Sequence, residues 1–289
     1  MMDNYTDCWY RSSDGLRLYA RDYHCRNLDK PGPETVLCMH GLTRNSADFS
    51  GLASHLCERY RVIAVDQRGR GRSDYDPEAA RYTATTYVKD MFTLVDQLDI
   101  PELILVGTSM GGLMSMLMAA MQPQRVRKMI INDIGPEIDP RGLARIKSYV
   151  GKSAPVQSWE DAVAQCRSIN EIAFPDFSDE QWLDFTQGVY REENGALVLA
   201  YDPAIAQPME GEASAALPPD MWSVFERCTS IPMLVVRGAS SDILSPDCVK
   251  AMCARHSGLK VAEIPNRGHA PTLTEPASLA AIDTFLADL

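Results

Sequence analysis

The feature that most constrains this chain is a serine between glycines, where an apolar run meets a helical pattern. Residues 103–106 are branched and apolar, as in a buried strand, and residues 113–120 are mostly Leu, Met and Ala, as in a helix. Between them stands the sequence GTSMGG, in which Gly107 and Gly111 flank Ser109. A strand-to-helix turn this tight strains the serine backbone and exposes its hydroxyl above the sheet. Ser109 is therefore a candidate nucleophile.

The net charge restricts which molecules the protein can bind, and the cysteine pattern indicates its redox compartment. The chain has 289 residues, with 39 acidic and 28 basic side chains and a net charge of −11, which disfavours nucleic acid and anionic membranes. Residues 1–7 lack the basic and apolar parts of a secretory signal, and no apolar run is as long as a membrane span. The eight cysteines include no Cys-x-x-Cys pair, which indicates reduced thiols. We expect a cytoplasmic protein that binds a small molecule, with its oligomeric state left open.

Short apolar runs alternate with helical patterns from residue 35 onward. A hairpin is predicted over residues 7–23, with its turn at Ser-Asp-Gly, residues 13–15. The later strand-like runs lie at 35–39, 61–66, 103–106, 128–133, 231–236 and 260–264. Strands that alternate with helices predict an α/β fold, with a mainly parallel sheet covered by helices on both faces.

The alternation breaks between residues 135 and 229. This stretch has helical patterns at 141–150, 159–172 and 179–189, with prolines between them and no comparable buried strand. A structureless loop of this length is improbable in a compact domain, so we expect a helical cap over the sheet edge where open α/β folds bind ligands. The predicted core domain comprises residues 1–134 and 230–289, and the cap, or lid, comprises 135–229. The alternative is a separate helical domain unrelated to the site.

A serine nucleophile needs a general base, and the base needs a carboxylate that orients it. Of the five histidines, His269 is favoured because it lies in a loop after the last predicted strand and before the terminal helix. Asp242, in the loop after the penultimate strand, is the preferred carboxylate. Asp133 also ends a predicted strand and is the alternative acid. His40, beside Gly41 at the end of another strand, is expected to brace its loop.

With these residues placed, the chain resembles the α/β-hydrolase family along nearly its whole length. The order Ser109, Asp242, His269 is the order of the triad in that family. The resemblance implies an eight-stranded sheet and an inserted helical cap. It also implies an oxyanion hole formed by the backbone N–H groups of Leu42 and Met110.

The glycine-rich segment at residues 66–74 belongs to the same resemblance. It is similar to a structural turn that follows one of the family's strands, so no chemistry is assigned to Arg68 or Arg70. Neither a metal nor a cofactor is implied.

The residue at the elbow narrows the activity. Haloalkane dehalogenases and epoxide hydrolases resemble this fold but carry aspartate at that position, so a serine there implies acyl chemistry. We expect cleavage of a small-molecule carboxylic ester or lactone through an acyl-enzyme on Ser109, since the chain looks like the small bacterial esterase, enol-lactonase and ring-cleavage-product hydrolase branch. The alternatives are a carbon–carbon bond hydrolase of vinylogous diketo acids with the same triad, a lyase or acyltransferase, and a non-enzymatic small-molecule receptor.

Five residues are possible substrate contacts. Arg141 and Arg145 are four residues apart, so on a helix they share a face that could meet a substrate carboxylate. The alternative for both is a basic face in contact with water. Trp159 and Trp182 are aromatic positions of the expected cap, and His40 lies next to the expected oxyanion loop.

Overall fold

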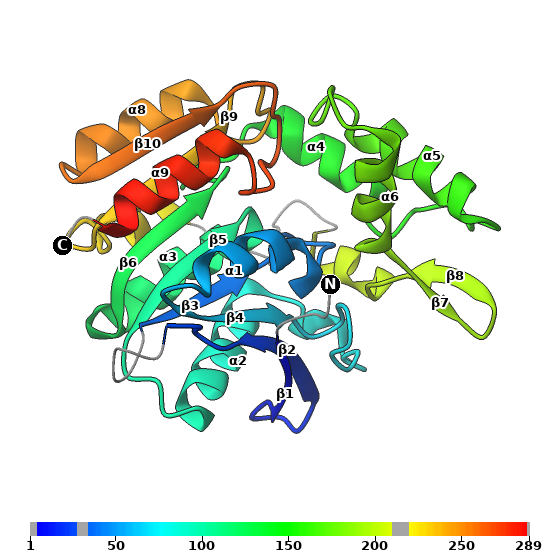
Figure 1. Ribbon diagram of the computed structural model, residues 1–289, viewed down its shortest axis with the longest axis horizontal. Helices are drawn as coiled ribbons and strands as arrows, with labels where there is room; N and C mark the ends of the chain where they lie inside the picture. The colour runs from blue at the N-terminus through cyan, green and yellow to red at the C-terminus, as the bar shows by residue number, and fades with distance from the viewer. Residues whose placement is uncertain (1–4, 28–33, 210–219, 288–289) are drawn as a thin grey trace.

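A central sheet organises the chain (Figure 1). The computed structural model describes residues 5–27, 34–209 and 220–287, within which the sheet has eight strands in the order β1-β2-β4-β3-β5-β6-β9-β10. Within this eight-stranded sheet, only the pairs β1–β2 and β2–β4 are antiparallel. The predicted mainly parallel, eight-stranded sheet is therefore confirmed. The strands are β1 Thr6–Arg11, β2 Arg17–Tyr23, β3 Thr35–Met39, β4 Arg61–Asp66, β5 Leu103–Thr108, β6 Val126–Asn132, β9 Met233–Gly238 and β10 Leu259–Ile264.

Helices cover both faces of the sheet because successive strand residues point to opposite sides. Val36 and Ile104 pack with the helices α1 (Ser50–Leu56) and α9 (Pro276–Ala287), which lie in front of the sheet in Figure 1. Their neighbours Leu37 and Leu105 pack on the opposite face. The helices of that face are α2 (Ala84–Gln97), α3 (Met110–Met121), α7 (Met221–Glu226) and α8 (Pro246–Arg255). Short 3-10 turns occupy Ser46–Phe49, Ala79–Arg81 and Pro123–Arg125.

The stretch between β6 and β9 holds the predicted helices and one hairpin that was not predicted. Its helices are α4 (Pro140–Tyr149), α5 (Trp159–Asn170) and α6 (Asp179–Gln187), followed by the antiparallel strands β7 (Tyr190–Glu193) and β8 (Ala196–Leu199) and a 3-10 segment, Pro203–Met209. In Figure 1 these elements lie together beside the sheet. The hairpin is short, and its residues are mostly half-buried or exposed, so it lacks the apolar run that marks a buried strand. Helix α7 packs instead against the core helix α3.

Main-chain hydrogen bonds join the cap segment to two loops of the core. The N–H of Gly71 donates to Ala200 O (2.8 Å), and the N–H of Asp202 donates to Gly69 O (2.8 Å). The N–H of Gly268 donates to Ala173 O (2.9 Å). The cap is thereby fixed to the glycine-rich turn after β4 and to the loop after β10. No helix within the described ranges is long and apolar enough to span a bilayer.

The turn between β5 and α3 brings three main-chain segments close together. Ser109 has a φ of 53°, which a non-glycine residue rarely adopts. A Cβ on Gly107 would lie 2.2 Å from Gly111 O, and a Cβ on Gly111 would lie 2.0 Å from Met39 O. Both positions therefore require glycine, as the sequence predicts.

Substituting Gly111→Ala should lower the free energy of unfolding by about 3 kcal/mol, because β3 and α3 must separate to admit the methyl group. Urea denaturation followed by circular dichroism measures the change. Gly258→Ala is the matched control, since a Cβ there meets its nearest atom only at 3.6 Å, on His256. Equal stability of the two variants would show that the close approach at Gly111 is not tight.

Candidate active site

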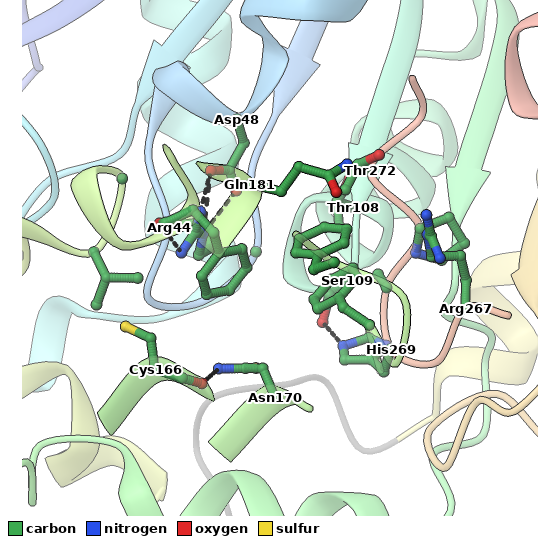
Figure 2. A pocket seen from close by; sticks show the side chains of 18 of the residues that line it. Arg44, Asp48, Thr108, Ser109, Cys166, Asn170, Gln181, Arg267, His269 and Thr272 are labelled. Atoms are coloured by element: carbon green, nitrogen blue, oxygen red, sulfur yellow. Dashed lines mark hydrogen bonds and ion pairs between the residues drawn. The ribbon is translucent and has the colours of Figure 1, made fainter. Parts of the chain in front are cut away.

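Three side chains from the carboxyl ends of three strands form a hydrogen-bonded chain. Ser109 Oγ lies 2.8 Å from His269 Nε2, and His269 Nδ1 lies 2.8 Å from Asp133 Oδ2. Figure 2 shows Ser109 pointing at the imidazole of His269. Ser109 follows β5, Asp133 follows β6, and His269 lies in the loop after β10. Parallel strands end at one edge of the sheet, so residues far apart in sequence meet there. The arrangement is that of a nucleophile, a base and a carboxylate that orients the base.

Asp133 is held in place by donors from the neighbouring strand. Its carboxylate is fully buried, with Oδ1 accepting the N–H of Gly238 (2.8 Å) and Oδ2 accepting the hydroxyl of Ser241 (2.5 Å). The N–H of Asp133 itself donates to Val236 O (2.7 Å). These bonds direct one carboxylate oxygen at the Nδ1 of His269. With that carboxylate ionised, Nδ1 carries the proton and Nε2 is free to accept one from Ser109.

The hydrogen bond expected between Asp242 and His269 is not found within the described residues, because the imidazole bonds to Asp133 instead. Asp242 instead forms a two-point ion pair with Arg145, at 2.6 Å from Nε and 2.8 Å from Nη2. Burial opposes ionisation of Asp242, but Arg145 outweighs it and holds the pKa of the carboxyl below its ordinary value. In the turn after β9 it is the Ser241 side chain that points at Asp133. The alternative acid, Asp133, is the one that contacts the imidazole.

The expected oxyanion residues lie on either side of Ser109. Leu42 follows β3, and Met110 is the first residue of α3. A Cβ on Gly41, the residue before Leu42, would lie 3.7 Å from Ser109 Cβ, so the loop passes directly beside the nucleophile. The N–H of Met110 belongs to the first turn of its helix, where N–H groups have no intrahelical acceptor.

His40 holds the loop of Gly41 and Leu42 through hydrogen bonds and does not line the cavity over Ser109. It is fully buried, with Nδ1 at 2.6 Å from Gly41 O and with Nε2 accepting the N–H of Gln67 (3.1 Å). Burial lowers the pKa of His40 to about 3, so the ring is neutral. The expectation that His40 braces its loop fits this geometry, whereas its possible role as a substrate contact does not.

A cavity of about 860 Å³ lies over Ser109 and His269. The core contributes the loops of Leu42, Ser109 and His269 to its wall, and the cap contributes both aromatic and polar side chains. The cap residues include Ile146, Tyr149, Phe174, Phe177, Phe185 and Tyr190. A concave site with apolar walls and several polar groups suits a small organic ligand.

Two arginines line the cavity on opposite sides of the Ser109–His269 pair (Figure 2). Arg44 donates to both carboxylate oxygens of Asp48, at 2.6 to 3.1 Å. Arg267 pairs with Glu275 (2.9 Å) and with Asp176 (2.5 Å). Each guanidinium therefore already has a carboxylate partner within the protein. Neither arginine was among the residues expected at the site, although Arg44 lies two residues from Leu42 and Arg267 lies two residues from His269.

The five expected substrate contacts, all within the described ranges, are absent from the cavity wall. Besides His40, Arg141 is 85% exposed and pairs with Asp139, and Arg145 is engaged by Asp242. These ion pairs favour a structural and solvated role for the two arginines.

The two tryptophans are also structural. The indole N–H of Trp159 donates to Glu192 (3.0 Å), which ties α5 to the β7–β8 hairpin. Trp182 is buried behind the cavity wall and contacts Phe174, Phe177 and Phe185. Phenylalanines, which no periodic pattern marks as ligand contacts, take the place expected for tryptophan.

The fold and this constellation define the α/β-hydrolase class. Residues 34–276 match the family described as the alpha/beta hydrolase fold, and the chain belongs to that family. The chain is 38% identical over 264 residues to the 3-hydroxybutyrate-oligomer hydrolase of Cupriavidus necator, covering 89% of each chain. It is 32% identical over 260 residues to the 2-(acetamidomethylene)succinate hydrolase of Mesorhizobium japonicum, covering 89% of this chain and 90% of the relative.

Solved structures agree with the assignment. An α/β hydrolase from Novosphingobium aromaticivorans superimposes with a TM-score of 0.92 at 38% identity, over 100% of both chains. The E-2-(acetamidomethylene)succinate hydrolase superimposes with a TM-score of 0.80 at 27% identity, over 97% of this chain and 99% of the other. Because the named relatives are hydrolases, the protein is an α/β hydrolase at the level of family and reaction class.

Proposed function

We propose that the protein hydrolyses a small-molecule carboxylic ester through an acyl-enzyme on Ser109. The observation that carries the proposal is the hydrogen-bonded chain from Ser109 through His269 to the buried Asp133 at the floor of the cavity. In the first step Ser109 Oγ attacks the ester carbonyl and its proton passes to His269 Nε2. The N–H groups of Leu42 and Met110 donate to the oxyanion that forms.

The same groups complete acylation and then carry out deacylation. As the tetrahedral intermediate collapses, the ester C–O bond breaks and His269 returns its proton to the leaving alcohol. A water molecule then gives a proton to His269 and attacks the acyl carbon, which releases the carboxylic acid and restores Ser109. Asp133 stays ionised and stabilises the imidazolium that forms in both halves.

The cavity and the relatives together support a proposal for the substrate class. The 3-hydroxybutyrate-oligomer hydrolase is the relative with 38% identity, and oligomers of a short hydroxy acid are linked by carboxylic ester bonds. Phe174, Phe177 and Phe185 offer apolar contact to their carbon chains, while the engaged state of Arg44 and Arg267 disfavours a dicarboxylate. We propose short hydroxy-acid esters as substrates. A lactone and a vinylogous diketo acid are the alternatives that the same triad serves.

The test is a turnover assay with dimers and trimers of 3-hydroxybutyrate, a lactone and a ring-fission diketo acid, combined with mass spectrometry of rapidly quenched enzyme. We expect turnover of the oligomers and a mass increase of one acyl group on the peptide that contains Ser109. Turnover of the diketo acid alone would identify a carbon–carbon hydrolase. Binding of all compounds without turnover would identify a receptor and overturn the proposal.

A further inference from the structure

Arg70, in the glycine-rich turn after β4, contacts both residues of the candidate oxyanion hole. Arg70 follows β4 and is fully buried. Its Nε donates to the carbonyl oxygen of Leu42 at 2.9 Å, and its Nη2 lies 3.9 Å from Met110 Sδ. One guanidinium thus contacts both residues whose N–H groups would face the substrate oxygen.

Within the part of the chain that the structure describes, the groups that contact the Arg70 guanidinium are neutral. Its Nη1 donates to Arg68 O and to the hydroxyl of Tyr87, each at 2.8 Å. The guanidinium carbon lies over the rings of Tyr82 and Tyr87, at 5.5 and 4.8 Å from their centroids. Within the described ranges no ion pair joins Arg70 to a carboxylate. A cation buried among neutral groups is costly unless a negative charge forms nearby.

Arg68, two residues earlier, shows the contrast. It is also buried, at 1% exposure, but it forms ion pairs with Asp14, Asp76 and Asp90 at 2.6 to 2.8 Å. Those carboxylates link the turn to β1–β2 and to α2, which is a structural role. The sequence predicted a purely structural role for both arginines. The contacts of Arg68 fit that prediction, whereas those of Arg70 do not.

We propose that Arg70 is a positioning residue for the oxyanion hole, which holds the Leu42 and Met110 segments and favours the negative charge that develops on the substrate oxygen. The inference rests on the proposed function. In a site shielded from water, the field of a fixed cation acts over several ångströms. The ground-state carbonyl carries little charge and the oxyanion carries a full one, so Arg70 should act on kcat more than on KM.

Three substitutions separate charge from hydrogen bonding. Arg70→Met removes both, Arg70→Gln keeps an amide donor for the Leu42 carbonyl without the charge, and Arg70→Lys keeps the charge. We expect the two neutral variants to lose about 10- to 100-fold in kcat with KM within about threefold, and Arg70→Lys to recover most of the loss. Arg72→Gln is the matched control, because Arg72 belongs to the same turn but is 50% exposed and pairs with Asp7.

A trifluoromethyl ketone supplies a second readout, because its adduct with Ser109 carries an oxyanion. Its affinity should fall in the neutral variants by the same factor as kcat. Wild-type kcat in Arg70→Gln, or a loss in Arg70→Lys as large as in Arg70→Met, would overturn the role of the charge. If the neutral variants do not fold, Arg70→Lys alone is compared with Arg72→Gln. A loss of tenfold or more in both kcat and ketone affinity for Arg70→Lys would then overturn the role of the charge. Failure of the proposed function appears differently, as a wild-type enzyme that forms no ketone adduct.

Discussion

Replacing Ser109 with alanine should lower kcat for an ester substrate by about 10⁵- to 10⁶-fold without measurable loss of stability. The Ser109 hydroxyl bonds to His269 Nε2, and the side chain lies at the floor of an open cavity, so its removal takes away the nucleophile and little packing. Single-turnover acylation and steady-state hydrolysis measure the loss, and urea denaturation checks the fold. Activity within tenfold of the wild type would exclude Ser109 as the nucleophile.

The partner of Ser109 provides the internal control for this result. His269→Ala should cost about as much as Ser109→Ala, because base and nucleophile act as one unit. The double variant should then be no worse than either single variant. If the two losses multiplied instead, Ser109 and His269 would act in separate steps, and the hydrogen bond between them would not be the proton path.

Asp133→Asn should lower kcat by about 10⁴-fold, whereas Asp242→Asn should lower it by less than about tenfold. An asparagine at position 133 turns an amide toward Nδ1 of His269 and favours the tautomer in which Nε2 carries the proton and cannot accept one from Ser109. Asp242 makes its bonds to Arg145 and none to the imidazole. The measurement is kcat of both variants on the same ester at the same pH.

The two substitutions are expected to affect stability differently, so a loss of activity through unfolding has to be excluded for each. The carboxylate of Asp133 is fully buried and that of Asp242 is 36% exposed, so each variant is compared with the wild type by thermal unfolding before its kinetics are interpreted. If Asp242→Asn proved the slower enzyme while both remained folded, the acid would belong to the loop after β9. The bond between Asp133 and His269 would then serve structure alone.

The sheet and the turn that carries Ser109 were predictable because periodic and local patterns determine them. A buried parallel strand is apolar throughout, and the glycines at the elbow reflect backbone contact of 2.0 to 2.2 Å that any Cβ would make. His269 followed from its position after the last strand. None of these inferences depends on the direction of a side chain within an irregular loop.

The choice between the two aspartates depends on such a direction. Both follow strands, and only the turn after β9 decides that the Ser241 side chain points at Asp133 while Asp242 pairs with Arg145 of the cap. Arg145 and Asp242 are 97 positions apart, so sequence spacing gives no sign of the pair. For the same reason the helical period placed Arg141 and Arg145 on a helix but gave no indication of the neighbours of that helix.

Part of the docking of the cap on the core runs through backbone atoms at Gly71, Asp202 and Gly268, beside side-chain ion pairs such as Arg145–Asp242 and Arg267–Asp176. A main-chain amide and a main-chain carbonyl are present at every position other than proline, so such docking makes little demand on which side chains the cap carries. Phe174, whose ring contacts are with Phe177, Trp182 and Phe185 of the cap, can therefore be exchanged without disturbing these main-chain bonds. In this hydrolase the wall of the cavity can be redesigned at such a position while the main chain keeps the cap docked on the core.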